Sequence, residues 1–205
     1  AACAVQCVVE PESTGIGGDN FCIYAPEGQI KDMIAFNGSG AAPAAATPEW
    51  YAENGITKLE RQTPHSVVIP GVIDAWETLI RDHGTMDLGE LLQPAIGYAR
   101  DGYPVSSRVS VDFASQEHLL VNDPAAKRVF MPNGKTPGVG EMHHQPELAE
   151  TLRKVAEHGR DAFYTGEVAE DIVSYLQSLG GLHTLEDFKN AIGEYVTPIS
   201  TNYRG

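Results

Sequence analysis

The feature that most limits the fold is a helical period of apolar residues that recurs after residue 70. The clearest case follows Pro70-Gly71 and ends at Gly84, a natural C-terminal stop. Its apolar face consists of Val72, Ala75, Trp76, Leu79 and Ile80. A chain with this pattern must bury helices against a common core.

Two further segments show the same period. In residues 147–158 it aligns Leu148, Leu152 and Val155, and in residues 166–179, ahead of Gly180-Gly181, it repeats. The second stripe consists of Val168, Ile172, Leu176 and Leu179. We predict an amphipathic helix over each segment.

Two short apolar runs near the N-terminus predict strands. Phe21 to Tyr24 is apolar enough for a buried strand, Pro26 to Gly28 is typical of a turn, and Ile30 to Phe36 returns as a second strand. Together they predict a hairpin that feeds a central sheet. With the helices, this hairpin places the chain in the α/β (α+β) class.

The other segments give weaker signals. Residues 1–9 suit a helix buried on all sides and stopped by Pro11, and residues 37–47 (NGSGAAPAAAT) suit a loop where backbones pass closely. We expect a solvent-facing excursion over 48–66 and two short helical turns over 87–92 and 94–100. The remaining expectations are a helix near 106–120, an irregular surface loop up to 145, and a short helix over 184–191 with a capping box from Thr184 to Asp187.

Composition excludes several classes of partner. The chain has 205 residues, of which 42% are hydrophobic, and a net charge of -14 from 14 Lys+Arg against 28 Asp+Glu. Such a charge repels phosphate backbones and anionic membranes. We therefore expect a globular protein that binds neither nucleic acid nor membrane. Since the chain begins without Met inside an apolar segment, we also expect polypeptide upstream.

Motifs for cofactors and metals are incomplete. The run from Gly15 to Asn20 resembles a dinucleotide fingerprint, but Asn20 stands where its third Gly belongs. We expect a tight turn there and no cofactor, although a nicotinamide-dependent oxidoreductase remains a third hypothesis. Gly38-Ser39-Gly40 lacks the outer spacing of a serine nucleophile elbow.

Histidines and cysteines do not form a metal motif. His143-His144 lacks the H-E-x-x-H pattern, so we expect a solvated loop, and the other histidines stand at helix ends or in loops. Glu10 replaces the third ligand of a cluster that would begin at Cys3 and Cys7. We expect these two and Cys22 to pack as small buried side chains, and we predict no metal site.

The order of short segments along the whole chain carries a resemblance. The segments are, in order, Val8 to Phe21 (VVEPESTGIGGDNF), Phe36 to Pro43 (FNGSGAAP), Pro70-Gly71-Val72, His83 to Met86 (HGTM), Gln93 to Ile96 (QPAI), Ala99 to Tyr103 (ARDGY), Gly180-Gly181-Leu182 and Thr197 to Gly205 (TPISTNYRG). In this order, across nearly all 205 residues, the set resembles the large subunit of gamma-glutamyltranspeptidases, enzymes of glutathione metabolism.

The resemblance implies an N-terminal-nucleophile hydrolase with an αββα sandwich, made as one precursor that cuts itself. The cut exposes a threonine at the start of a small subunit, and that threonine's α-amino group activates its hydroxyl for attack on an amide. On this view residues 1–205 are part of a large subunit whose partner is the small subunit, with a dimer of heterodimers as a further possibility. No catalytic residue falls on this chain, and Thr197 and Thr201 are not the nucleophile. Alone, the chain is expected to be inactive.

Substrate specificity is where this sequence departs from the family pattern. Members that take γ-glutamyl compounds carry an Arg in an F-R-E-x-A-P segment, whose guanidinium grips the α-carboxylate. Three alignments place Asn37, Ser39 or Ala41 at that position, and none is charged. Losing such a charge-assisted pair costs about 1.5–3 kcal/mol. The acyl donor is therefore expected to be an amide other than glutathione, as in the oxamate-amidohydrolase-like branch.

The resemblance assigns Asn37, Ser39 and Ala41 to substrate binding, with Asn37 and Ser39 as neutral donors that line the acyl pocket. A purely structural role in shaping a tight loop fits them equally well. The compartment stays open, because family members are often periplasmic or secreted and the amidohydrolase-like branch can be cytoplasmic. The alternative function is a non-catalytic binding or scaffold protein that retains the large-subunit fold.

Overall fold

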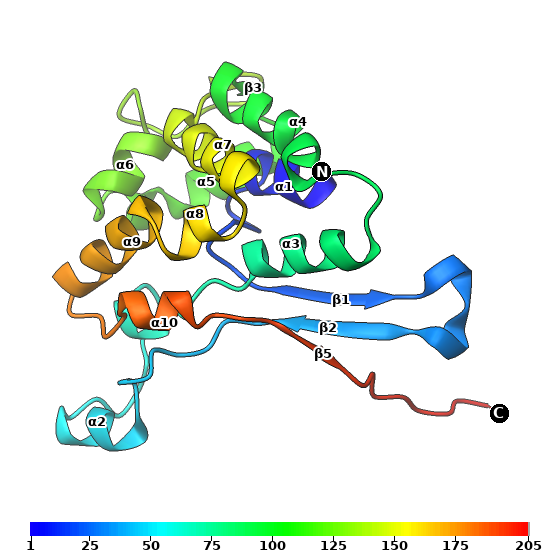
Figure 1. The fold of residues 1–205 in the computed structure, drawn as a ribbon. Coiled ribbons are helices and arrows are strands. Elements are labelled where there is room, and N and C mark those ends of the chain that lie inside the picture. The colour runs from blue at the N-terminus through cyan, green and yellow to red at the C-terminus, as the bar shows by residue number, and fades with distance from the viewer. Residues whose placement is uncertain (205) are drawn as a thin grey trace. The chain divides into compact units, whose positions relative to one another are not determined.

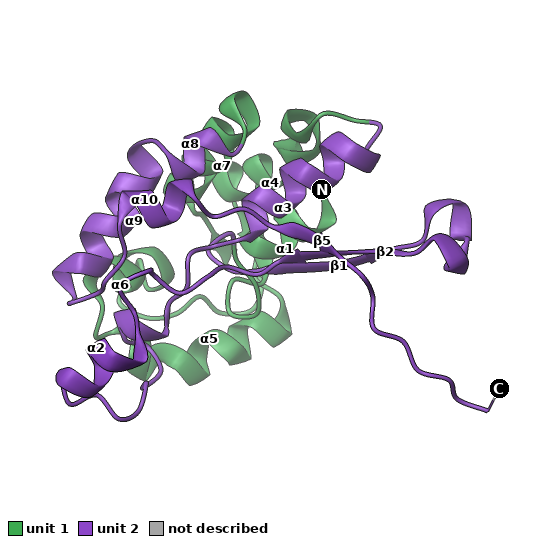
Figure 2. Ribbon diagram, turned by 60° about the horizontal axis from the view of Figure 1, so that its bottom comes forward, with its two compact units in different colours: residues 1–15, 86–159 green, residues 16–85, 160–205 purple. Residues whose placement is uncertain are grey.

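The chain forms two units that alternate along the sequence (Figure 2). The computed structural model describes residues 1–204. Residues 1–15 and 86–159 form unit 1, and residues 16–85 together with the segment from Arg160 onward form unit 2. Among residues 1–204, no helix combines the length and the apolar character that a bilayer crossing requires.

Unit 2 contains a three-stranded antiparallel sheet of order β1-β2-β5 (Figure 1). Its strands are β1 (Asn20–Tyr24), β2 (Ile34–Gly38) and β5 (Glu194–Val196). The predicted hairpin is confirmed, but its second strand starts at Ile34, since Ile30–Asp32 forms the 3-10 turn η2 after η1 (Pro26–Gly28). β5 was missed because its three residues are all exposed and show no alternation.

The helices of unit 2 agree in part with the sequence. They are α2 (Pro48–Glu53), the 3-10 turn η3 (Pro64–Ser66), α3 (Val72–His83), α8 (Asp161–Tyr164), α9 (Glu167–Ser178) and α10 (Leu185–Lys189). Three of them, α3, α9 and α10, lie where the sequence predicts helices, whereas α2, η3 and α8 were not predicted. The capping box of Thr184 and Asp187 is present. The excursion over 48–66 contains α2 and η3.

The buried stripe of α9 differs from the predicted one. It consists of Ala169, Val173 and Leu176, whereas Leu179 lies beyond the end of the helix and is 53% exposed. α9 packs against α8, and its buried face, which includes the small Ala169, is turned by one residue from the stripe of larger side chains. α7 shows the same shift, with Ala149 buried in place of Leu148.

Unit 1 is built around α4. Its elements are α1 (Ala2–Val9), α4 (Leu88–Asp101), β3 (Tyr103–Pro104), α5 (Ser107–Leu120), α6 (Pro124–Phe130), β4 (Met142–His143) and α7 (Pro146–His158). α4 packs against α7 and α1. The irregular loop predicted up to residue 145 therefore contains α6 and β4.

Two expectations for unit 1 are wrong. The two turns over 87–92 and 94–100 form one continuous helix, in which Pro94 is tolerated because Leu92, Ala95 and Ile96 bury a shared face. The helix over 1–9 is buried on one face only, at Ala4, Cys7 and Val8.

The sheet of unit 2 is covered on one face. α3 runs along β1 and β2, and the Phe36 and Tyr195 rings meet on its side at 5.0 Å (Figure 1). Cross-strand partners share a face. The register therefore places Phe21, Ile23, Asn37 and Val196 on the opposite face.

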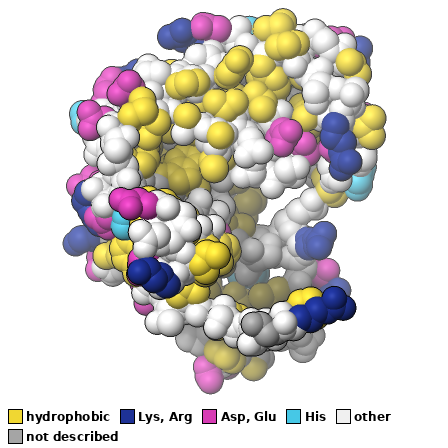
Figure 3. Space-filling view, turned by 90° about the vertical axis from the view of Figure 1, so that its right-hand side faces the viewer, with side chains coloured by type: hydrophobic (Ala, Val, Ile, Leu, Met, Phe, Trp, Pro, Cys, Tyr) yellow, Lys and Arg dark blue, Asp and Glu magenta, His cyan; other side chains and the backbone are white. Residues whose placement is uncertain are grey.

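That opposite face carries the apolar side chains of Phe21, Ile23 and Val196 beside the polar Asn37 and Glu194, and it is open to solvent. Phe21 is 71% exposed, Ile23 70% and Val196 39%. The prediction that Phe21 to Tyr24 form a buried strand is therefore wrong for the described residues, because none of them covers this face of β1. On the side of the molecule that Figure 3 shows, hydrophobic side chains are exposed among charged and polar ones. A sheet of this kind normally buries both its apolar faces, so this one calls for another layer.

Candidate functional site

The loop after β2 crosses the segment that leads into α3, and the two backbones are in van der Waals contact. A side chain on Gly40 would place its Cβ 1.5 Å from the carbonyl oxygen of Ile69, and one on Gly71 would come within 2.0 Å of the Gly38 carbonyl oxygen. The crossing is tied by a hydrogen bond from Ile69 N to the Ala41 oxygen at 2.9 Å. The prediction that backbones pass closely in residues 37–47 is therefore confirmed, and glycine is required by space.

Two side-chain acceptors take successive amides of this loop. Asn37 Oδ1 accepts from Ser39 N at 3.1 Å, and Asp19 Oδ1 accepts from Gly40 N at 2.8 Å. Because its oxygen turns back to the loop, Asn37 keeps its Nδ2 amide as a donor. Both backbone donors are occupied, so they are not free to bind an anion.

The three predicted site residues lie together at the end of β2. Asn37 is half-buried in the strand, and Ser39 and Ala41 are exposed in the loop. The Ser39 hydroxyl donates a long hydrogen bond of 3.4 Å to the Gly40 oxygen. Their role in substrate binding stays a prediction.

The Gly-rich turn ahead of β1 supports the loop from the other side. Gly18 O accepts hydrogen bonds from Gly71 N at 3.0 Å and Val72 N at 3.1 Å. The turn therefore joins the start of α3 to the strand backbone, as a packing turn does. Asp19 belongs to the same turn, and sequence reasoning missed its contact with Gly40 because the two residues are 21 positions apart.

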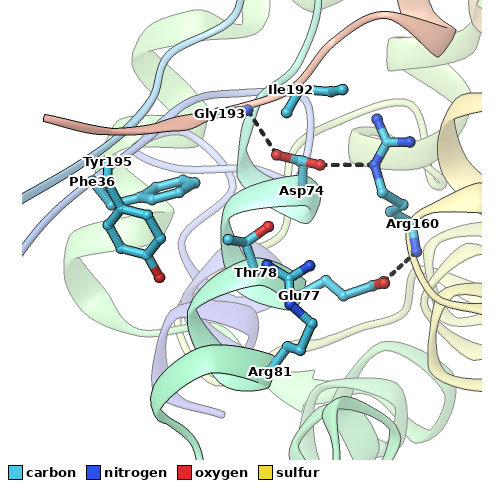
Figure 4. Close-up of a pocket in the computed structure, with 9 residues that line it drawn as sticks. All are labelled: Phe36, Asp74, Glu77, Thr78, Arg81, Arg160, Ile192, Gly193 and Tyr195. Carbon is cyan, nitrogen blue, oxygen red and sulfur yellow. Dashed lines mark hydrogen bonds and ion pairs between the residues drawn. The ribbon is translucent and has the colours of Figure 1, made fainter.

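A separate cavity of about 340 Å³ lies between α3 and β5 (Figure 4). It is lined by Phe36, Asp74, Glu77, Thr78, Arg81, Arg160, Ile192, Gly193 and Tyr195. Arg160 donates a hydrogen bond to each of the two carboxylates of this cavity. Its Nε donates to Asp74 at 2.7 Å, and its backbone N donates to Glu77. The acidic groups are therefore engaged by the protein itself.

Asp74 and Arg160 form a buried network that the sequence did not reveal. Their side chains are 5% and 22% exposed. The second carboxylate oxygen of Asp74 accepts from Gly193 N at 2.8 Å, while Arg160 Nη2 donates to the Ala191 oxygen at 2.7 Å. The network thus fixes the segment that leads into β5.

Tyr164 completes this network beneath the arginine. The guanidinium of Arg160 lies 4.7 Å from the ring centroid, and the Tyr164 hydroxyl donates to the Pro70 oxygen at 2.7 Å. Burial raises the pKa of Tyr164 well above its ordinary value. It therefore stays a neutral donor.

His143 is buried, which corrects the expectation of a solvated loop for His143-His144, although His144 is exposed; His183 lies in a loop as expected but is buried as well. His143 in β4 is 2% exposed beside Tyr103, Phe113 and Phe130, and its Nε2 has no hydrogen-bond partner among the described residues. The aromatic side chains shield it from water. Burial lowers the pKa of His143, and the neighbouring His144 lowers it further. Burial also lowers the pKa of His183, whose Nε2 lies 2.9 Å from the Val67 oxygen.

The cysteines are only partly as expected. Cys7 is buried and lies 3.8 Å from the Thr14 hydroxyl, Cys22 is half-buried, and Cys3 is exposed. Burial raises the pKa of the Cys7 thiol. Within residues 1–204, no cluster of His, Cys, Asp and Glu could hold a metal ion.

Solved structures define the class of protein. The gamma-glutamyltranspeptidase of Helicobacter pylori matches with a TM-score of 0.91 and 27% identity, over 99% of this chain and 59% of that one. A cephalosporin acylase from Bacillus halodurans matches with a TM-score of 0.91 and 33% identity, over 99% of this chain and 39% of that one. The fold is that of the N-terminal-nucleophile hydrolases, as predicted.

The family profile described as gamma-glutamyltranspeptidase matches residues 1–205, so the chain belongs to the gamma-glutamyltranspeptidase family. The glutathione hydrolase-like YwrD proenzyme of Bacillus subtilis is 37% identical over 205 residues, which are all of this chain and 39% of that protein. The oxamate amidohydrolase proenzyme of Klebsiella pneumoniae is 36% identical over 92% of this chain and 36% of its own length. The chain thus spans well under half the length of these relatives.

Proposed function

We propose that this chain is the large-subunit part of an amide hydrolase or acyltransferase that cleaves itself from a precursor. The nucleophile is a threonine on polypeptide outside residues 1–205, as the family resemblance implies. Its hydroxyl oxygen attacks the amide carbon, its α-amino group takes the proton, and the amine leaves. Water or a second amine then releases the acyl group. No residue of this chain takes a catalytic role.

The observation that carries this proposal is the uncovered sheet face. Phe21, Ile23 and Val196 lie on the side away from α3. Burial of a large apolar side chain is worth roughly 1.5–3 kcal/mol. A second sheet from the small subunit would cover this face and complete the αββα sandwich. A scaffold protein that acts without the small subunit, the alternative function, would not be expected to leave apolar side chains of its sheet exposed.

The position of Asn37 supports the same proposal. By register it shares the uncovered face with Phe21, its partner in β1. Its free amide donor therefore lies on the side where the partner sheet would sit. A pocket formed there would combine Asn37, Ser39 and Ala41 with residues of the small subunit.

The substrate we propose is a small amide that lacks an α-carboxylate to be gripped. Neither Asn37, Ser39 nor Ala41 can carry positive charge, and the loop amides at Ser39 and Gly40 already have acceptors. An acylated small molecule without a carboxylate illustrates this class.

The test uses the full-length gene product. Its intact mass should show two chains, and the small one should begin with a threonine whose replacement by Ala abolishes both cleavage and amide hydrolysis. Ammonia release from small amides without a carboxylate should exceed glutathione hydrolysis. A precursor that remains uncleaved and inactive on every amide would refute the proposal, and turnover by residues 1–205 alone would refute the location of the nucleophile.

A further inference from the structure

The candidate loop is bordered by carboxylates. Asp19 Oδ1 holds Gly40 N at 2.8 Å, and Asp187 Oδ1 holds Ala44 N at 2.9 Å. Neither Asp19 nor Asp187 forms an ion pair within residues 1–204, and Asp19 is exposed. The loop therefore lies in a negative local field.

No basic residue of the surrounding strands offsets this field. Lys31 is the single Lys or Arg in residues 1–57, and it lies in η2, outside the paired strands. Lys58, the next one, is paired with Glu60 at 2.8 Å. In the part of the chain that carries the loop and its two strands, residues 1–57, a carboxylate would meet Asp19 with Lys31 as the single cation. The nearest basic residue on the other border is Lys189 at the end of α10.

We propose that Asp19 is a specificity-determining residue of the acyl pocket, where its carboxylate disfavours acyl groups that carry a carboxylate and favours uncharged or ammonium-bearing ones. This inference rests on the proposed function. It goes beyond the absence of an arginine, because it assigns selectivity to a charge that is present. Asp19 also positions the loop, since it takes the Gly40 amide.

The two roles of Asp19 separate in two variants. Asp19→Asn keeps an oxygen that can accept from Gly40 N and removes only the charge. Asp19→Ala removes both. If the charge of Asp19 selects substrates, Asp19→Asn should change the ratio of the kcat/KM values for different amide substrates. If Asp19 only positions the loop, Asp19→Ala should lower kcat/KM for all of these amides by a similar factor.

The experiment compares three amides with the same three-methylene chain. Glutaramate ends in a carboxylate, pentanamide in a methyl group and 4-aminobutanamide in an ammonium. The processed full-length enzyme should show kcat/KM for pentanamide and 4-aminobutanamide above that for glutaramate. In Asp19→Asn this preference should shrink by about 3–10-fold, as expected for removal of one solvent-screened charge near the ligand, and added salt should shrink it in the wild type.

Asp32→Asn is the matched control, because it removes one exposed carboxylate from the same hairpin, in η2. It should leave the ratio unchanged. A ratio equally unaffected by Asp19→Asn, or a wild-type preference for glutaramate, would overturn the inference.

Binding of the same three amides, measured by saturation-transfer NMR, separates this inference from the proposed function. If none of them is hydrolysed but the binding preference depends on Asp19, catalysis on this amide series is refuted and the inference holds. If none binds, the inference is wrong even where another amide is hydrolysed.

Discussion

The carboxylate of Asp74 accepts a hydrogen bond from Arg160 Nε at 2.7 Å, across 86 positions of sequence. The pair joins α3 to the residue that precedes α8. Through Gly193 N it also reaches the start of β5, whose Glu194 pairs with Asn37. An ion pair away from the candidate loop thus fixes the strand beside it.

Replacement of Asp74 by Ala should lower the free energy of unfolding by about 3–5 kcal/mol, because the nearly buried Arg160 and the Gly193 amide would lose their acceptor. Urea denaturation of the two proteins measures the difference. Arg81→Ala is the control, since its pair with Asp82 involves a guanidinium that is 64% exposed and should cost at most about 1 kcal/mol. Equal effects of the two variants would contradict the buried pair.

Replacement of Gly40 by Ala should destabilise unit 2 by about 3 kcal/mol or more, since the new Cβ would overlap the Ile69 carbonyl and force the crossing apart. Thermal and urea unfolding report the loss. Gly17→Ala offers a matched comparison in the same unit, because no atom lies within 4 Å of its Cβ position. That variant should be neutral or gain up to about 1 kcal/mol. If Gly40→Ala left the free energy of unfolding unchanged, the two backbones at the crossing would not be in close contact.

Acid should destabilise unit 1 through His143. Its pKa is lowered in the folded protein, so the unfolded chain binds the proton more readily. The stability that comes from keeping it neutral is fully present above the usual pKa of about 6.5 and is lost as the pH falls toward the folded value. Hydrogen exchange of the β3 and β4 amides should accelerate, relative to a chemical reference, between about pH 7 and pH 5.

His143→Phe should remove this pH dependence, because Phe fits the surrounding rings and does not titrate. His158→Gln, at an exposed position at the end of α7, should leave it in place. A slope that persists in His143→Phe would assign the effect to other groups.

Charge on the uncovered sheet face should block assembly without unfolding the chain. Ile23→Asp should change the stability of residues 1–205 by only about 0.5 kcal/mol, as expected for an exposed site. In the full-length protein it should suppress self-cleavage, because a second sheet cannot pack on a buried, unpaired carboxylate. Val111→Asp on α5, where Val111 is 66% exposed, is the control. Normal processing of Ile23→Asp, read by intact mass, would argue against a layer on this face.

The sequence predicted the elements whose signals are local. The period of α3, the stop at Gly84 and the capping box at Thr184 and Asp187 each depend on residues within one or two helical turns. The hairpin of β1 and β2 likewise follows from two apolar runs around a turn. These features were predicted because neighbouring residues determine them.

The contacts that organise the candidate site are long-range. Gly40 requires glycine because of Ile69, Asp19 matters because of Gly40, and Asp74 is buried because Arg160 arrives from the other part of unit 2. Pro94 lies inside a helix because tertiary packing outweighs its cost. None of these partners is visible in a local window, so periodicity and spacing could not reveal them.

The alternation of the two units along the chain affects how the protein is made. The polypeptide passes from one unit to the other after residues 15, 85 and 159. On the ribosome, β2 is synthesised early, but the backbone groups along one of its edges stay unpaired until β5 emerges more than 150 residues later. Translation therefore leaves that edge open for an interval in which a chaperone, or a premature contact with another nascent chain, could occupy it.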